Sequence, residues 1–163
     1  MTHMVQRRAV LAAIGGIAGG SLAGCSGDEP AESTESDYPE YTDVPDDVKE
    51  YLSNTSNFDG TGVDRTDAEE VSVTVGARGN GSYWAFDPAV VAVSPGTTVV
   101  WEWTGRGSTH NVASPDGREP LYSGPAVTSS SETYAYTFEE SGAYQYVCEP
   151  HEIQGMKGAV IVV

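Results

Sequence analysis

Residues Ala89–Trp103 read AVVAVSPGTTVVWEW, two runs of β-branched and aromatic residues separated by a Pro-Gly turn at Pro95. Such residues favour strands, and a Pro-Gly pair ends one strand before the next begins. Successive side chains of a strand point to opposite faces, so Val99, Trp101 and Trp103 share one face and the intervening glutamate lies on the other. The stretch therefore predicts two strands that present an apolar face to a buried core.

Further short runs extend this pattern from residue 71 to residue 163. They are Val71–Val75, Thr133–Phe138, Ala143–Cys148 and Gly158–Val163. Turn pairs such as Asp116-Gly117 and Ser141-Gly142 separate them, and no helical pattern of any length intervenes. Strands of this length and spacing predict an all-β domain, a Greek-key β-sandwich or barrel with its β core at about 71–163.

The chain begins with the features of an export signal over residues 1–24. Arg7 and Arg8 precede an apolar run, Ala9 to Leu22, that is shorter than the roughly 20 residues an untilted membrane-spanning helix needs. The arginine pair resembles a twin-arginine signal, and the sequence LAGC ending at Cys25 resembles a lipobox. A lipid on Cys25 would anchor the mature chain to the membrane. An ordinary cleaved signal with Cys25 unmodified is the alternative.

Residues 25–43 are acidic and polar without apolar periodicity, which predicts a disordered tether. The folded domain is expected over 44–163, and a short helix should open it. Apolar residues recur there at helical spacing, namely Val44, Val48, Tyr51 and Leu52, with Pro45 at the first turn. The triplets beginning at Asn54 and Asn80 match the glycosylation acceptor pattern, which is weak evidence by itself.

The charge balance limits the kinds of partner. The chain has 24 acidic against 8 basic residues, a formal net charge of −16 at pH 7. This disfavours nucleic-acid binding. Such an excess of acid resembles proteins of halophiles, and at molar salt the Debye length is only about 3 Å. Partners would then be recognised by short-range apolar contact rather than by steering between charges.

Removal of residues 1–24 leaves few side chains that bind soft metals. They are His110, His151, Met156 and, besides Cys25, Cys148. Three of the four lie in the loop CEPHEIQGM, which starts at Cys148. On the preceding strand Tyr144, Tyr146 and Cys148 share a face, so the thiol should lie at a strand end and point inward. Two imidazoles, a thiolate and a distant thioether form the ligand set of blue copper.

Other interpretations of these residues remain in view. Taken singly, each is more often structural: a hydrogen-bonded histidine, a methionine in the core, an inert buried cysteine. Zinc sites prefer four Cys or His ligands to a thioether. Dinuclear copper centres need a second loop cysteine, and copper oxidases need further histidines. A catalytic thiol at Cys148 could use His151 as base, but no oxyanion hole is suggested. The joint occurrence favours one mononuclear copper.

Several motifs together resemble a known family. The loop Cys148-x2-His151-x4-Met156, the upstream His110-Asn111-Val112 and the closing Gly155–Val162 resemble the plastocyanin branch of the cupredoxins. The segment Tyr51–Gly60 with Val63-Asp-Arg65 resembles the halocyanins of haloarchaea. The resemblance covers about residues 44–163 and the leader. It implies a cupredoxin fold in which His110, Cys148 and His151 are equatorial copper ligands and Met156 is the axial one.

The same resemblance assigns further roles near the copper. Asn111 would steady the Cys148 loop, and the ring edge of His151 would be the port through which the electron passes. Apart from the resemblance, we predict that an apolar docking face surrounds His151, formed by Pro150 and Ile153 with Leu121 or Pro125. Two carboxylates on the loop, Glu149 and Glu152, carry a separate hypothesis: they favour Cu(II) and so lower the reduction potential.

The function implied is a one-electron carrier, not an enzyme, with one copper that cycles between Cu(I) and Cu(II). It would shuttle electrons between membrane-bound respiratory complexes as a monomer on the outer face of the cell membrane. The alternative is an extracytoplasmic copper-holding protein or copper chaperone. Copper carriers tend toward several methionines or exposed sites, whereas a set of two His, one Cys and one Met suits retention and redox cycling.

Overall fold

The structure is a computed structural model that describes residues 38–117 and 120–163. The expected export signal at 1–24, the lipid site at Cys25 and the acidic segment up to residue 37 lie outside the described residues. In the part that is described, no helix is long and apolar enough to cross a membrane.

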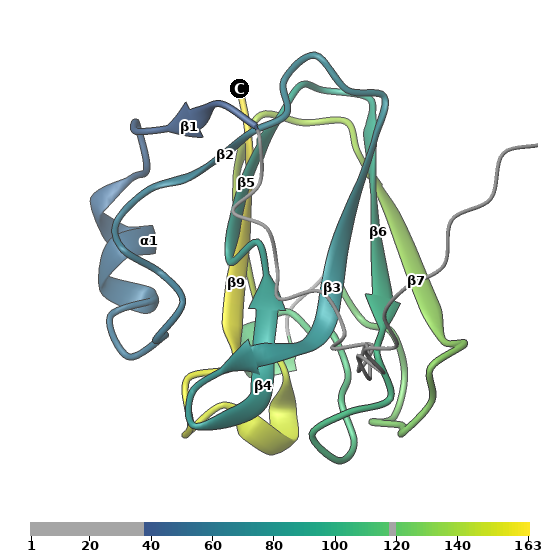
Figure 1. The fold of residues 1–163 in the computed structure, drawn as a ribbon. Coiled ribbons are helices and arrows are strands. Elements are labelled where there is room, and N and C mark those ends of the chain that lie inside the picture. Colours follow the sequence, from purple (N-terminus) through teal and green to yellow (C-terminus); the bar gives the residue numbers. More distant parts are fainter. Residues whose placement is uncertain (1–37, 118–119) are drawn as a thin grey trace, which may run out of the picture. The chain divides into compact units, whose positions relative to one another are not determined.

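Two sheets form the domain, and Figure 1 shows them as facing layers. The first has the order β1-β2-β5-β9-β8, made of β1 (Glu40–Tyr41), β2 (Gly62–Asp64), β5 (Val90–Val93), β9 (Lys157–Val162) and β8 (Gly142–Val147). The second has the order β4-β3-β6-β7, made of β4 (Ser82–Asp87), β3 (Glu70–Gly79), β6 (Thr97–Trp103) and β7 (Thr133–Phe138). Strands β2 and β5, β5 and β9, and β3 and β6 pair in parallel, and the other neighbours are antiparallel. The all-β, two-sheet fold expected from the sequence is confirmed.

The core lies between the two sheets and follows the alternation in β6. Val99, Trp101 and Trp103 are all buried, while the glutamate between the two tryptophans is exposed. From β8, Tyr146 meets Trp101 edge to face, with ring centroids 5.3 Å apart and planes at 85°. This arrangement is favoured by the ring quadrupoles. The inward face predicted for both strands is therefore the one that packs.

The expected N-terminal helix is present as α1 (Asp46–Tyr51), and it covers the outer face of the first sheet (Figure 1). It buries a second apolar cluster whose members are Val44, Val48, Leu52, Val90, Ala159 and Ile161. Complete burial of one such Val or Leu side chain contributes roughly 1.5–3 kcal/mol. Because α1 covers the outer face and the core covers the inner one, all four residues of β5 are buried. Strand β5 therefore reads as a continuous apolar run rather than as an alternation.

The predicted boundary between tether and domain at residue 43 differs from the structure. Glu40–Tyr41 already pair with β2 in antiparallel register. The guanidinium of Arg65 lies 4.1 Å from the centroid of the Tyr38 ring. Two residues are too short to show alternation, so the acidic composition masked this edge strand.

Candidate metal centre

His110 lies in the loop between β6 and β7 and is fully buried. Its backbone exchanges two hydrogen bonds with Val127, each 3.0 Å long. Its ring Nε2 lies 2.6 Å from the carbonyl oxygen of Arg106, which can only accept, so Nε2 carries the proton. The second ring nitrogen, Nδ1, is then left with a free lone pair. This bond fixes the tautomer needed for a metal ligand.

Cys148 follows β8 directly, and the chain then turns through the single-turn helix η2 (Glu149–His151). The N–H of His151 donates to the carbonyl of Cys148 at 3.0 Å, which closes the turn. Two more backbone bonds close the loop: Cys148 N–H to the Met156 carbonyl at 3.0 Å, and Met156 N–H to the His151 carbonyl at 3.1 Å. The three predicted ligands of this loop are thus held together by the backbone itself.

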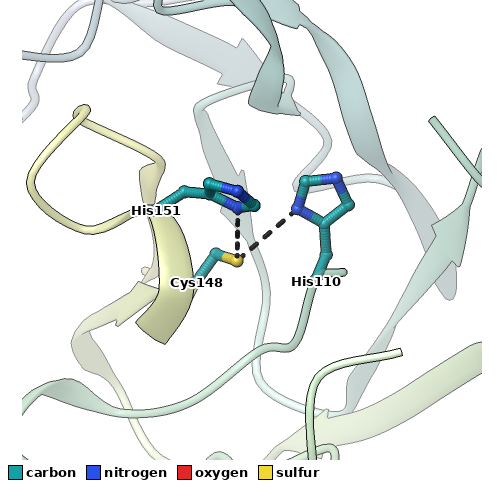
Figure 2. Close-up of side chains that lie close together, drawn as sticks. All are labelled: His110, Cys148 and His151. Atoms are coloured by element: carbon teal, nitrogen blue, oxygen red, sulfur yellow. Dashed lines mark hydrogen bonds between the residues drawn. The ribbon is translucent and has the colours of Figure 1, made fainter. Parts of the chain in front are cut away.

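The side chains of the two histidines and the cysteine converge on one point. Cys148 Sγ lies 3.6 Å from His110 Nδ1 and 3.5 Å from His151 Nδ1. Figure 2 shows both imidazoles turned toward the same sulfur. All three ligand atoms lie within 4.8 Å of one another, and all three residues are buried. This is a cluster that could hold one metal ion.

Met156 is buried completely and belongs to the same apolar cluster as Cys148. Its backbone bonds to Cys148 and His151 place it beside the two ligands of the loop. A methionine held here could supply a weak thioether donor to the site. Its part as the axial ligand stays a prediction.

Burial sets the protonation state of the ligands. It raises the pKa of the Cys148 thiol to about 11, although backbone N–H groups of Asn111 and His151 oppose the rise. Burial also lowers the pKa of His110 and of His151. The imidazoles are therefore neutral at pH 7 and the thiol is protonated. A cation that binds sulfur can displace that proton, and the two nitrogens and one soft sulfur fit copper.

Asn111, to which the family resemblance assigned a supporting role, contacts the start of the ligand loop and clamps it through two hydrogen bonds to Glu149. Its Oδ1 accepts the backbone N–H of Glu149 at 3.0 Å, and its Nδ2 donates to the carboxylate of Glu149 at 2.5 Å. The same Nδ2 lies 3.3 Å from the carbonyl of Gly124. Glu149 is thus a partner of the clamp as well as a surface charge.

One aromatic residue at the site was missed by the sequence reasoning. Trp84 in β4 stacks on His151, with ring centroids 5.1 Å apart and planes at 17°. The run SYWAFD around it alternates poorly, and no spacing rule relates it to a loop 67 residues later. The only signal available was the presence of a third tryptophan outside the core face of β6.

The predicted docking residues divide into three that are exposed and one that is not. Ile153 is 92% exposed, and Pro150 and Pro125 are also exposed. Leu121 is 1% exposed, so its assignment to the surface was wrong. Its N–H donates to the Ser114 side chain at 3.0 Å and its side chain packs in the core.

The comparisons with known proteins agree with this site. The model for copper-binding proteins of the plastocyanin/azurin family matches residues 71–163. Halocyanin from Natronomonas pharaonis is 39% identical over 165 residues, which covers 99% of each chain. Pseudoazurin from Methylorubrum extorquens is 33% identical over 95 residues, 58% of this chain and 63% of that protein.

Among solved structures, a copper-containing nitrite reductase from Thermus scotoductus matches 58% of this chain at 26% identity, with a TM-score of 0.45. The match spans only 22% of that chain. The family rests instead on the match over residues 71–163 and on the likeness to halocyanin along the whole chain. This protein belongs to the plastocyanin/azurin family of copper-binding proteins and is a halocyanin-like cupredoxin.

Proposed function

We propose that this protein is a one-electron carrier with a single type 1 copper site, shuttling electrons between membrane-bound respiratory complexes. The observation that supports this most is the convergence of two imidazoles and one thiol in a buried, braced cluster. When bound there, copper would alternate between Cu(I) and Cu(II), which supplies a one-electron step. The chain has three histidines in all, and two are used in this cluster, so a second, catalytic copper lacks ligands.

The residues around the site suit rapid electron exchange because they restrict movement. Arg106 fixes the His110 ring, Asn111 fixes the start of the loop, and backbone bonds join Cys148 to Met156. Ligands held in this way need little rearrangement when the charge of the metal changes. Burial of the thiol also excludes water and competing oxidants. The same features oppose rapid release of the metal, which a copper chaperone would require.

His151 is the ligand best placed to pass the electron to a partner. It is 8% exposed, whereas His110 and Cys148 have no exposure. Two residues further on, the Ile153 side chain is 92% exposed and offers apolar surface for docking. Apolar contact is the attraction that survives in concentrated salt. We therefore propose that Pro150 and Ile153 line the docking surface.

This docking surface can be tested with a matched pair of variants. Ile153→Lys should slow electron transfer to the membrane fraction at high salt. Val163→Lys is the control, because Val163 is 51% exposed and lies at the other end of the domain, beyond β9 (Figure 1). Equal rates in the two variants would exclude the Ile153 surface as the docking site.

Localisation belongs to the same proposal. The twin-arginine and lipobox motifs support export and a lipid on Cys25, which would hold a monomer on the outer face of the cell membrane. Mass spectrometry of the protein extracted from membranes should find a diacylglyceryl adduct on Cys25. A chain recovered in the aqueous phase with unmodified Cys25 would contradict the anchor without affecting the copper site.

The redox function has a direct test. The full-length chain reconstituted with Cu(II) should be intensely blue, lose the colour with ascorbate and regain it with ferricyanide. Cys148→Ser should be colourless, because the colour requires the thiolate. The competing function is copper holding. A protein with that function would lose its copper to a chelator within minutes, and it would bind Cu(I) but show no blue colour that bleaches and returns.

A further inference from the structure

The two imidazoles of the metal centre are held by different means. The His110 ring is fixed by its hydrogen bond to the Arg106 carbonyl. The His151 ring has no equivalent: among residues 38–117 and 120–163, the one hydrogen-bond partner of its ring nitrogens is the Cys148 thiol. The terminal torsion of a histidine is broad. Some other contact must therefore set the orientation of His151.

Two rings contact the His151 ring: the His110 ring is tilted at 51° to it, and the indole of Trp84 lies nearly parallel to it. A centroid distance of 5.1 Å and an angle of 17° between the planes correspond to offset stacking, which favours a parallel imidazole over a rotated one. Nothing about copper is needed for the contact, because it exists between two side chains of the protein. The indole therefore restricts rotation of the imidazole before metal arrives.

Trp84 is itself fixed at both ends. Its Nε1–H donates to the Gly107 carbonyl at 2.8 Å, and its backbone carbonyl accepts from Asn80 Nδ2 at 2.7 Å. The same Asn80 amide donates to the Gly155 carbonyl at 3.0 Å, and Gly155 precedes Met156 in the ligand loop. Strand β4 and the ligand loop are thus tied by one side chain. This bonding occupies the nitrogen that glycosylation of Asn80 would require.

The two supports of the imidazoles meet in one short segment. Arg106 accepts from His110, and the next residue, Gly107, accepts from Trp84. Gly107 has φ +79°, and a Cβ there would overlap the carbonyl of Tyr83, so glycine is required for this close approach. Two consecutive carbonyls of one loop therefore orient both histidines. The Arg106 carbonyl bonds His110 directly, and the Gly107 carbonyl bonds Trp84, which stacks on His151.

We propose that Trp84 is a positioning residue for His151. Trp84 and His110 are both hydrogen-bonded to the segment Arg106–Gly107, so the two imidazoles share one support. The benefit of this positioning, which is to keep the ligands still during electron transfer, rests on the proposed function. The positioning itself is a property of the apo chain and can be measured without electron transfer.

Three variants of the full-length chain separate stacking from packing. Trp84→Leu keeps apolar volume without a ring, and Trp84→Phe keeps a ring without the bond to Gly107. Tyr83→Leu is the matched control in the same strand, because the Tyr83 ring lies 5.2 Å from the Arg106 guanidinium and is not among the rings that contact His110 or His151. Thermal unfolding of the three apo chains verifies that each is folded.

The first measurement is nuclear magnetic relaxation of the His151 ring nitrogens in the apo chain. Ring motion should increase in Trp84→Leu and stay near wild type in Trp84→Phe and Tyr83→Leu. The second is copper affinity by chelator competition. Trp84→Leu should bind about three- to tenfold more weakly, the range that one stacked ring pair accounts for, and Trp84→Phe should recover most of the loss.

The third measurement is the reduction potential. It should rise in Trp84→Leu, because Cu(I) tolerates a loosened imidazole better than Cu(II) does, and it should not change in Tyr83→Leu. If Trp84→Leu matches Tyr83→Leu in ring motion and affinity, or if Trp84→Phe behaves as Trp84→Leu, the positioning role is wrong. A copper-bound wild type that exchanges no electrons, with these differences intact, would overturn the proposed function alone.

Discussion

Copper uptake at pH 7 should release about one proton per metal ion, and Cys148 should be its source. Burial raises the pKa of this thiol to about 11, so at pH 7 only about one molecule in 10,000 holds a thiolate. The same burial lowers the pKa of both ring ligands below the usual 6.5, so they are already neutral at pH 7 and release little. The apparent copper affinity should consequently rise about tenfold, or about 1.4 kcal/mol, for each pH unit between 7 and 9.

The proton can be counted directly. Apo full-length chain in weak buffer is titrated without oxygen with Cu(I), and an indicator dye reports the protons released at each addition. Wild type should release about one per copper, and Cys148→Ser about none, because a serine hydroxyl keeps its proton. A wild type that releases none would show that the buried thiol is already ionised and refute the burial argument. Release of two would show that an imidazole was protonated as well.

Other expected outcomes follow from the same contacts. Denaturant titrations of the apo chain should show the free energy of unfolding fall by about 2–3 kcal/mol as the pH rises from 9 to 11, relative to Cys148→Ser. The reason is that the Cys148 thiol keeps its proton in the folded chain and loses it in the unfolded chain. Asn111→Ala should cost about 1–3 kcal/mol of unfolding free energy in the same assay, since it leaves the Glu149 N–H without its partner; equal stability would show the clamp to be unimportant. Gly76→Ala should lower the free energy of unfolding by about 1–3 kcal/mol and weaken copper binding. At φ +82° the added Cβ would lie 2.8 Å from the Arg106 carbonyl oxygen, which fixes the His110 ring. Unchanged copper affinity would contradict this. Potentiometry should show a rise in the reduction potential of Glu149→Gln and of Glu152→Gln, and no change or a fall would count against charge control of the potential.

The candidate ligands could be predicted from the sequence because residues of these types are few and because three of them lie in one short loop. Beyond the expected export signal the sequence has no histidine or methionine besides His110, His151 and Met156, so counting was enough to select the candidate ligands. The inward face of β6 followed in the same way from strict alternation. Residue counts and local spacing therefore specified the candidate ligands.

The supports of the ligands could not be predicted, because they depend on contacts between distant segments. Trp84 meets His151 only after two sheets pack, and a backbone carbonyl such as that of Arg106 carries no mark in the sequence. Leu121 was expected on the docking face around His151, yet its side chain fills the core, and no local pattern in the sequence distinguishes the two positions. The pairing order of the strands, including three parallel pairs, also depends on sheet assembly rather than on local pattern.

The segment that contains α1 lies before residues 71–163, the part that the plastocyanin/azurin model matches, and it also contacts the loop that holds Cys148 and His151. The Tyr51 hydroxyl donates to the Tyr146 carbonyl at 3.1 Å, and the Thr55 hydroxyl donates to the Gly155 carbonyl at 2.9 Å. A fragment that begins at residue 71 would keep all four predicted ligands. It would lose both of these hydrogen bonds and expose the outer face of β5 and β9. A transplanted copper domain should thus include α1 as well as residues 71–163, the part in which the copper-site motifs lie.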